Sequence, residues 1–505
     1  MKKYCLEIIV FVTGAVVMVM ELVGSRVIAP YSGTSLAVWT SLIGIILGSL
    51  SVGYFLGGRL ADQRLSYKTL GNIILFSALL TGLINFIKPL AFLLVQGNLD
   101  IRFGSILLTT VLFAPVSVVL GMVPTYSVRL RIKDVKTSGA TIGRLYALST
   151  IGSIVGTFAA GFFLISFFGS SKILVLLSVT LFITSLLAFW GNWEKKMLVT
   201  MIIIVAGNLL SGGLNEFYKD VIVEDKDSSY NRIIVAKFTH YQNKRPVLAL
   251  ITGRIFGPTT FQTSVYLDGK KEPVPGYLDY FDLAKVFNPH TNFALMIGGG
   301  GYSYPQEFLD KNPNARLDVV EIDPKLTEVA KKYFGLEDNT RLVIHHTDGR
   351  NYINKVDKKY DVIFLDVFSG DSSIPFHLTT IETIRRLYEI LNPQGAIYMN
   401  TISSLEGDTG KYFRAQLSTY KRVFPYVLVF PVDDANDTKL IQNIVIVALK
   451  NKTGLTTQEN LIQEYSSYLS HLYAKDLEEG LVLSDDYAPV EQYFMPIVNA
   501  WAKKT

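Results

Sequence analysis

Seven apolar segments in the first 214 residues constrain the fold more than any other feature of the chain. They are residues 8–28, 38–56, 70–86, 106–123, 145–168, 173–190 and 197–214. Most are close to the ~20 residues that an α-helix needs to cross a bilayer. A cleaved signal peptide would account for the first segment but not for the six that follow it. We therefore predict a multi-pass transmembrane domain over residues 1–214, embedded in the lipid bilayer.

A second constraint comes from residues 293–323. An apolar run from Phe293 leads into Gly298-Gly-Gly-Gly301, a helix-compatible segment follows, and a second apolar run ends on Glu321. This order predicts a strand, a tight turn, a helix and a parallel strand. Glycines let backbone N–H groups approach a ligand, and an acid about 20 residues further on suits a ribose. The segment therefore predicts an adenosine-type ligand in contact with Gly298, Gly300 and Glu321.

Two more predicted strands end near acids. Residues 341–345 precede Asp348-Gly349, and residues 360–365 precede Asp366. In open α/β sheets, ligands bind at the carboxyl ends of the strands. Three acids at this edge suit a nucleoside that carries a ribose, an exocyclic amine and a positive centre, and they would repel the pyrophosphate of a dinucleotide. A sulfonium nucleoside has these three features, so we predict an α/β Rossmann-like domain that binds one.

These motifs resemble the polyamine aminopropyltransferase family, the spermidine synthases. The resemblance covers residues 229–407 and rests on the glycine turn, Val320-Glu-Ile-Asp323, Tyr360-Asp-Val-Ile-Phe-Leu-Asp366 and Asp279-Tyr-Phe-Asp282. It implies a Rossmann-like fold of the class I adenosylmethionine-dependent transferase type over residues 276–505. It also implies a small antiparallel β domain, which we place at residues 215–275. The implied co-substrate is decarboxylated S-adenosylmethionine, with no metal, and the implied acceptor is an amine such as putrescine.

The resemblance also implies a role for each candidate residue. Asp366 either accepts the proton of the attacking amine or stabilises the cation, and sequence alone does not separate the two. Tyr280 orients the nucleophile. Glu321 binds the ribose, and Asp348-Gly349 binds the adenine. Tyr230 and Asn231 either face the ligand or simply end a strand.

Two positions depart from the family pattern. Gly301 stands where the family has an aspartate that holds the terminal amine of the co-substrate, and the second acid of the catalytic segment is displaced to Asp371. The chain is closer to a membrane-fused branch of the family, in which segments like residues 375–380 and 485–491 recur. Residues 485–491 form either a lid or a capping turn, and the turn is favoured.

The departures leave three functions open. The first is transfer of an aminopropyl group to putrescine, which makes spermidine in a membrane-anchored enzyme. The second is methyl transfer from ordinary S-adenosylmethionine to a membrane or small-molecule substrate. The third is a non-catalytic module of a transporter, in which the sheet senses a nucleoside or polyamine and the helices carry out the transport.

The loops between the apolar segments differ strongly in charge. Twelve basic residues fall on one side: Lys2, Lys3, Arg59, Arg64, Lys68, Arg129, Arg131, Lys133, Lys136, Arg144, Lys195 and Lys196. Only Arg102 and Lys172 fall in the loops opposite, so the positive-inside rule places the N-terminus in the cytoplasm. Seven spans would then place the catalytic domain outside, away from any adenosyl sulfonium. We expect a cytoplasmic catalytic domain and a span count that differs by one. Either Lys88-Pro89 marks a re-entrant or additional segment, or the final apolar segment lies on the membrane interface.

Other patterns exclude several classes of function. A net charge of +5, carried largely by the membrane loops, gives no evidence for a nucleic-acid partner. His345 and His346 lack a third ligand at matching spacing, so we predict no metal site. Glu21 and Arg26 lie in or beside the first apolar segment, either as an interfacial pair or as a functional site. The acceptor, the role of the helices and the oligomeric state, a homodimer among the alternatives, stay open.

Overall fold

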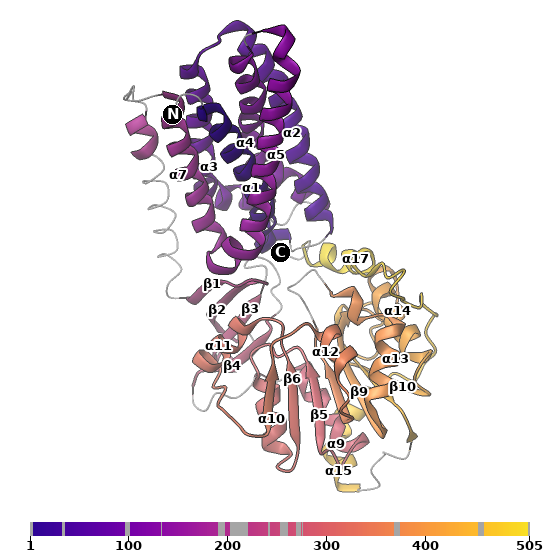
Figure 1. Ribbon diagram of the computed structural model, residues 1–505. Helices are drawn as coiled ribbons and strands as arrows, with labels where there is room; N and C mark the ends of the chain where they lie inside the picture. Colours follow the sequence, from indigo (N-terminus) through magenta and orange to yellow (C-terminus); the bar gives the residue numbers. More distant parts are fainter. Residues whose placement is uncertain are drawn as a thin grey trace.

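Figure 1 shows the computed structural model, in which a helical bundle stands on an α/β part. It describes residues 4–32, 36–95, 101–132, 134–189, 197–202, 221–240, 243–252, 261–268, 274, 276–367, 374–452 and 459–502. Asp371, predicted as a substrate contact, therefore lies outside the described residues, as does most of the seventh apolar segment, residues 197–214.

Long apolar helices form the bundle. They are α1 (Cys5–Ser32), α2 (Leu36–Gln63), α3 (Tyr67–Val95), α4 (Ile101–Arg131), α5 (Ser138–Ala159), which continues through a π-helical turn to Phe167, and α7 (Ser170–Phe189). Six stretches of the described chain are long and apolar enough to cross a membrane, and they coincide with the first six predicted segments. Helix α3 runs unbroken through Lys88 and Pro89. The re-entrant segment expected there is therefore wrong.

The two ends of the bundle have different neighbours. We call the end of the bundle that meets the α/β part the inner end and the opposite end the outer end. At the inner end, Arg26 of α1 donates a 3.2 Å hydrogen bond to the carbonyl oxygen of Ser228 in the α/β part. At the outer end, Glu7 near the start of α1 forms a 3.1 Å salt bridge with Arg131. Glu7 and Arg26 are 26 − 7 = 19 residues apart in one helix, which corresponds to about 28 Å. The start of α1 thus lies at the end of the bundle away from the α/β part (Figure 1).

This arrangement bears on the expected orientation. Helix α7 begins at the inner end, where the N–H of Ser170 donates to Asp227 at 2.8 Å, and it ends at the outer end with Phe189 packed near Met197. Strand β1 (Ile222–Asp227) lies at the inner end again. The N-terminal end of α1 and the α/β part therefore lie at opposite ends of the bundle. A cytoplasmic N-terminus together with a cytoplasmic catalytic domain, as expected from the sequence, does not agree with this arrangement.

Two sheets make up most of the α/β part. The smaller is antiparallel, with strands in the order β1, β2 (Arg232–Thr239), β3 (Pro246–Thr252) and β4 (Thr263–Tyr266). Alternating apolar residues of this sheet pack on helix α11 (Pro324–Tyr333), with Val235 and Leu250 fully buried against Val329. The small sheet is thereby held against the start of the nucleotide-binding unit.

The larger sheet has seven strands in the order β10-β11-β9-β8-β5-β6-β7. The strands are β5 (Phe293–Ile297), β6 (Arg316–Val320), β7 (Leu342–His345), β8 (Tyr360–Leu365), β9 (Leu391–Ser403), β10 (Tyr426–Pro431) and β11 (Gln442–Leu449). Strands β5 to β9 are parallel, and β11 runs antiparallel to both of its neighbours. This is the predicted Rossmann-like fold, with the sheet order reversing between β5 and β8.

Helices cover both faces of the large sheet (Figure 1). They are α10 (Ser303–Lys311), α11, α12 (Gly349–Lys355), α13 (Ile381–Ile390) and α14 (Lys411–Lys421). Helix α17 (Val490–Ala502) packs on α14 instead. Each face has its own core, one centred on Phe281, Phe364 and Tyr398 and the other on Ile363, Leu387 and Phe413. Strands with both faces buried explain the near-continuous apolar runs in the sequence.

Candidate active site

A cavity of about 190 Å³ lies at the carboxyl edge of the large sheet. Ile297 of β5 pairs with Val320 of β6 and Leu365 of β8, so Gly298, Glu321 and Asp366 all follow at one level. The cavity sits where the strand order reverses, the usual ligand position in open α/β sheets. Its lining comprises Tyr230, Asn231, Thr252, Gln262, Ile297, Gly298, Gly300, Val320, Glu321, Ile322, Leu326, Thr347, Asp348, Gly349, Asp366, Val367, Pro375, His377 and Leu378.

The glycine turn brings its backbone against the neighbouring strand. Gly298 has φ +94°, and a Cβ there would lie 2.1 Å from the carbonyl oxygen of Asp366. Gly300 has φ +51°. Both conformations favour glycine. The turn therefore leaves the cavity floor open to a ligand that approaches the backbone.

Glu321 is buried and holds this turn from below. Its Oε2 accepts from the N–H of Gly299 at 2.9 Å, and its Oε1 accepts from the N–H of Asp323 at 2.9 Å. Burial raises the pKa of Glu321, and the backbone hydrogen bonds oppose that shift. A carboxylate has about four acceptor positions, and the backbone N–H groups of Gly299, Gly300 and Asp323 use up to three of them. The remaining positions are available to a ligand in the cavity.

Asp366 follows β8 and is held by two side chains. Its Oδ2 accepts from the hydroxyl of Tyr277 at 2.7 Å, and its Oδ1 accepts from Nδ2 of Asn400 at 3.1 Å. Asn443 donates at 3.0 Å to the amide oxygen of Asn400, which fixes that amide's orientation. Burial raises the pKa of Asp366, while both donors lower it. The carboxyl therefore has a fixed direction and a proton affinity above that of an exposed aspartate.

Asp348 and Gly349 form the third side of the cavity. Asp348 caps α12 by accepting from the N–H of Asn351 at 2.9 Å. Its other oxygen lies 3.2 Å from Nε2 of His377, which also lines the cavity. Gly349 packs closely, because a Cβ there would lie 2.8 Å from Ile297. This corner combines an acid and an imidazole that can both contact a nucleobase.

Most of the cavity lining lies in a part of the chain that matches a known family model. The spermine/spermidine synthase domain matches residues 281–459. The chain therefore contains a spermine/spermidine synthase domain. It is accordingly a transferase.

Relatives of two kinds align with this spermidine synthase-like chain. A polyamine aminopropyltransferase of Vibrio vulnificus is 27% identical over 288 residues, which cover 54% of this chain and 91% of that protein. A bovine eEF1A lysine and N-terminal methyltransferase is 29% identical over 194 residues, 35% of this chain and 26% of that protein. A crystal structure of a probable spermidine synthase from Corynebacterium glutamicum has 18% identity and a TM-score of 0.40, and the match covers 51% of this chain and 88% of that one.

The tyrosine predicted from the family motif lies elsewhere. Tyr280 donates to the carbonyl oxygen of Val432 at 3.2 Å, lies 2.9 Å from Nδ1 of His471 and is buried. Tyr277, one turn earlier in the same 3₁₀ helix, contacts Asp366 instead. One 3₁₀ turn advances the chain by about 6 Å, which separates the two hydroxyl groups. The predicted role of Tyr280 in orienting the nucleophile does not agree with this placement.

The departure from the family at Gly301 has a packing cause. The N–H of Gly301 donates to Oγ1 of Thr263 at 2.9 Å. A Cβ at this position would lie 2.6 Å from Cβ of Thr263. Gly301 is absent from the cavity lining given above, because strand β4 of the small sheet covers it. An aspartate here would require that strand to move.

The structure brings most predicted site residues to one cavity and adds others. Asn231, Gly298, Gly300, Glu321, Asp348, Gly349 and Asp366 all line it. Sequence reasoning missed Tyr277, which holds Asp366 from outside the lining, and His377, whereas it had named Tyr230 beside Asn231. The available signals were a second tyrosine one turn before Tyr280 and the histidine inside the branch segment 375–380.

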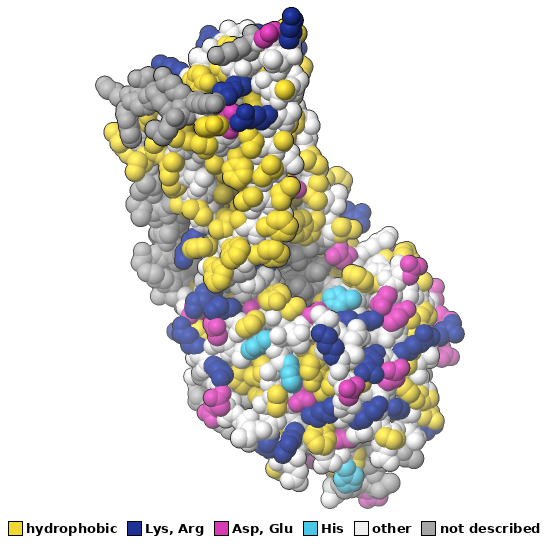
Figure 2. Space-filling view, in the orientation of Figure 1, with side chains coloured by type: hydrophobic (Ala, Val, Ile, Leu, Met, Phe, Trp, Pro, Cys, Tyr) yellow, Lys and Arg dark blue, Asp and Glu magenta, His cyan; other side chains and the backbone are white. Residues whose placement is uncertain are grey.

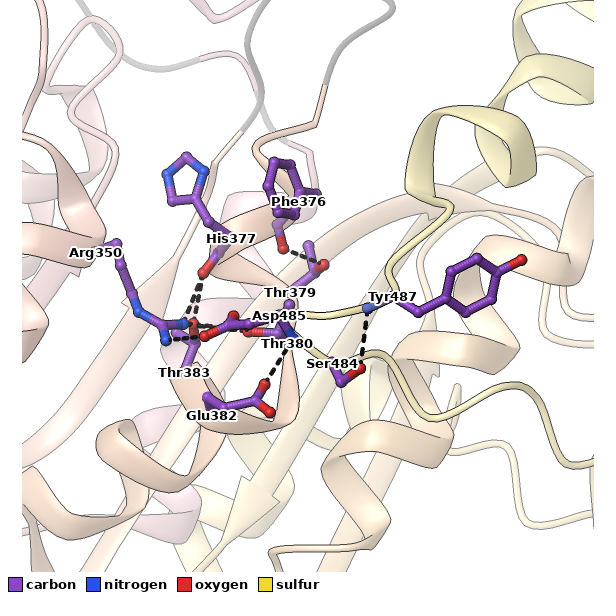
Figure 3. Close-up of polar contacts among 10 residues, drawn as sticks. All are labelled: Arg350, Phe376, His377, Thr379, Thr380, Glu382, Thr383, Ser484, Asp485 and Tyr487. Atoms are coloured by element: carbon purple, nitrogen blue, oxygen red, sulfur yellow. Dashed lines mark hydrogen bonds and ion pairs between the residues drawn. The ribbon is translucent and has the colours of Figure 1, made fainter.

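The tail residues 485–491 begin with a fixed turn beside this cavity (Figure 3). The carboxylate of Asp485 accepts from Arg350 at 2.7 Å and from Thr380 at 2.6 Å, and its N–H donates to Glu382 at 3.0 Å. Arg350 also donates to the carbonyl oxygen of His377 at 2.9 Å. The tail therefore braces the loop that carries His377, which agrees with a capping turn.

Proposed function

We propose that this protein is a membrane-anchored aminopropyltransferase that moves an aminopropyl group from decarboxylated S-adenosylmethionine to putrescine. The observation that carries the proposal is the convergence of Glu321, Asp348 and Asp366 on one cavity at the switch point of the sheet. Two of these acids suit the ribose and adenine of a nucleoside. The third is directed by two hydrogen bonds toward the place where the reacting carbon would lie.

The reaction assigns a task to Asp366. The amine nitrogen attacks the aminopropyl carbon next to sulfur, the C–N bond forms, the C–S bond breaks, and its electron pair stays on sulfur as the neutral thioether 5′-methylthioadenosine. The amine must lose a proton, because an alkyl amine of this kind has an unperturbed pKa of about 10 and is protonated at neutral pH. Asp366 accepts that proton. Its raised pKa makes it a better base than an exposed aspartate.

The remaining cavity residues bind and orient. Glu321 accepts from the ribose hydroxyls while it holds the glycine turn, and Asp348 accepts from the exocyclic amine of adenine. Asn231 and Tyr230 line the cavity just before strand β2 of the small sheet and form part of the acceptor's wall. Asp371 is kept as a proposed second contact for the amine on sequence grounds alone.

Methyl transfer from ordinary S-adenosylmethionine is the second candidate, and Gly301 favours it. An acid at this position would attract an ammonium and repel the carboxylate of the ordinary cofactor, and here a glycine covered by Thr263 does neither. The relatives that are eEF1A methyltransferases support the same alternative.

Product analysis separates the two candidates. The full-length protein is incubated with putrescine and either sulfonium, and products are identified by mass spectrometry, with Asp366→Asn as the matched control. Spermidine and 5′-methylthioadenosine formed only with the decarboxylated donor support the proposal. Methylated product from the ordinary cofactor would replace it by the alternative.

The proposal also sets the side of the membrane. The donor is a cytoplasmic metabolite in this proposal, so the catalytic domain faces the cytoplasm and the N-terminus faces the other side. That orientation opposes the positive-inside rule, because the described members of the basic set flank the outer ends of the helices: Arg59, Arg64, Lys68, Arg129, Arg131, Lys136 and Arg144. Exposed apolar side chains cover the face of the bundle that Figure 2 shows, and they mark a region that lipid would contact.

A further inference from the structure

Arg26 is a charged residue in a candidate membrane helix, and its side chain leaves the bundle. It lies near the inner end of α1, and its two terminal nitrogens donate to the carbonyl oxygens of Ser228, at 3.2 Å, and Ser229. Ionisable residues within membrane segments are rare and are commonly functional. The hydrogen bonds of Arg26 go to the catalytic part of the chain, so the interfacial pair with Glu21 considered from the sequence is not what the structure shows.

The loop that Arg26 holds forms part of the cavity wall. The hydroxyl oxygen of Ser228 accepts from the N–H groups of Tyr230, at 3.0 Å, and Asn231, at 2.9 Å. Tyr230 and Asn231 both line the cavity. The position of this turn therefore decides where two cavity side chains lie.

The same loop continues to the predicted ribose carboxylate. Ser228 Oγ forms a hydrogen bond with Oδ2 of Asp323. The N–H of Asp323 donates to Oε1 of Glu321 at 2.9 Å. Arg26, Ser228, Asp323 and Glu321 thus form one continuous chain of hydrogen bonds from the membrane helix to the cavity.

A second bundle helix, α7, forms hydrogen bonds with Asp227, the residue before Ser228. Asp227 accepts from the backbone N–H of Ser170 at 2.8 Å and from its hydroxyl at 3.2 Å, at the first turn of α7. The Asp227 and Asp323 carboxylates also interact electrostatically with Arg26. Two membrane helices therefore fix residues 227–229 in place.

We propose that Arg26 is a positioning residue for the nucleoside site, so that the membrane bundle supports the catalytic cavity as well as anchoring it. This inference rests on the proposed nucleoside site. Arginine suits the task because its planar group donates to two carbonyl oxygens at once in a fixed geometry. Lysine carries the charge on a single nitrogen and reproduces only part of the contact.

The test compares four variants of the full-length protein in lipid nanodiscs. The probe is 5′-methylthioadenosine, whose binding is measured by calorimetry, together with KM for the donor and kcat. Arg26→Gln should weaken probe binding and raise KM by about tenfold, the scale of one lost charged hydrogen bond, with kcat within about twofold of wild type. The probe affinity and the KM of Arg26→Lys should fall between those of wild type and Arg26→Gln.

Two further variants guard the interpretation. Ser228→Ala removes the link to Asp323 without touching the membrane helix and should give the same KM effect even if Arg26→Gln folds poorly. Glu491→Gln weakens a different contact between bundle and catalytic part, because it removes the negative charge from the acceptor of the 2.8 Å hydrogen bond from the N–H of Leu36, and it should leave affinity unchanged. Unchanged affinity in both Arg26→Gln and Ser228→Ala, or an equal loss in Glu491→Gln, would overturn the inference. Failure of wild type to bind the probe would instead overturn the proposed function.

Discussion

The hydroxyl of Tyr277 donates a 2.7 Å hydrogen bond to Oδ2 of Asp366, and the hydroxyl of Tyr280 points away from that carboxylate. Tyr277 is absent from the cavity lining given above, so it acts through Asp366 by directing it. The hydrogen bond favours the ionised form of Asp366 and lowers its pKa against the effect of burial. Two tyrosines one turn apart thus have different relations to the reaction.

The first prediction uses this pair. Tyr277→Phe should lower kcat by about 10- to 100-fold, because a hydrogen bond to a charged group contributes about 1.5–3 kcal/mol. Loss of the donor also raises the pKa of Asp366 further. A base must be ionised, so the acidic limb of the pH–rate profile should move to higher pH. Tyr280→Phe is the control, and it should keep the wild-type limb. A shift of the limb in Tyr280→Phe but not in Tyr277→Phe would contradict the assignment.

The second prediction concerns Glu321. Glu321→Gln replaces one acceptor by a donor that faces the N–H of Gly299 or Asp323, and it removes the charge from the ribose position. Affinity for 5′-methylthioadenosine should fall by about 1.5–3 kcal/mol, measured by calorimetry. Asp318→Asn on the same strand is the matched control, since Asp318 is a buried carboxylate bound by Lys358 and Tyr360. It should lower the melting temperature and keep the affinity. Equal affinity in wild type and Glu321→Gln would remove Glu321 from the site.

Sequence reasoning located Glu321 and Asp366 because both follow apolar runs whose lengths and order specify parallel strands. The carboxyl ends of such strands meet at one edge whatever the loops do. It assigned the role to Tyr280 and missed Tyr277, since both lie in one short helix and only the packing of Tyr280 on Phe430 and Tyr468 decides their directions. Motif spacing therefore predicted the strand ends better than the segment between the two sheets.

Contacts between distant segments were beyond the same reasoning. Thr263 packs on Gly301, and Arg26 donates a hydrogen bond to Ser228. The residues of each pair are far apart in the chain. Neither depends on a local pattern. The six described helices were predicted from length and apolar content alone, whereas the end of the bundle that meets the catalytic part required the contacts themselves.

The third prediction concerns the tail. Asp485→Asn should weaken the ion pair with Arg350 and lower stability by roughly 1 kcal/mol, the scale of a partly exposed pair. Thermal unfolding of the full-length protein measures this. Asp486→Asn changes the neighbouring exposed carboxylate and should leave the melting temperature unchanged. If both variants have the melting temperature of wild type, the turn does not stabilise residues 375–380.

The fourth prediction concerns Gly301. Gly301→Ala should destabilise the protein by about 1–3 kcal/mol, because the added Cβ would lie 2.6 Å from Cβ of Thr263. Gly276→Ala is the control, since a Cβ at Gly276 meets nothing within 4 Å. Adding Thr263→Gly to Gly301→Ala should cost less than the sum of the two single changes. Additive losses in this cycle would show that the two residues do not press on each other. The crowding also means that Gly301→Asp alone cannot report donor selectivity.

The last prediction concerns the membrane. The start of α1 and the catalytic part lie at opposite ends of the bundle, so reporters fused to the two termini should report opposite sides, whichever way the protein inserts. Green fluorescent protein matures in the cytoplasm and alkaline phosphatase folds outside it, and each is fused in turn to either terminus. The proposed donor requires a fluorescent C-terminal fusion and an active N-terminal phosphatase. The basic residues at the outer end favour the reverse. Two termini on one side would contradict the structure, and a C-terminal phosphatase that is active would exclude a cytoplasmic sulfonium donor while leaving the fold intact.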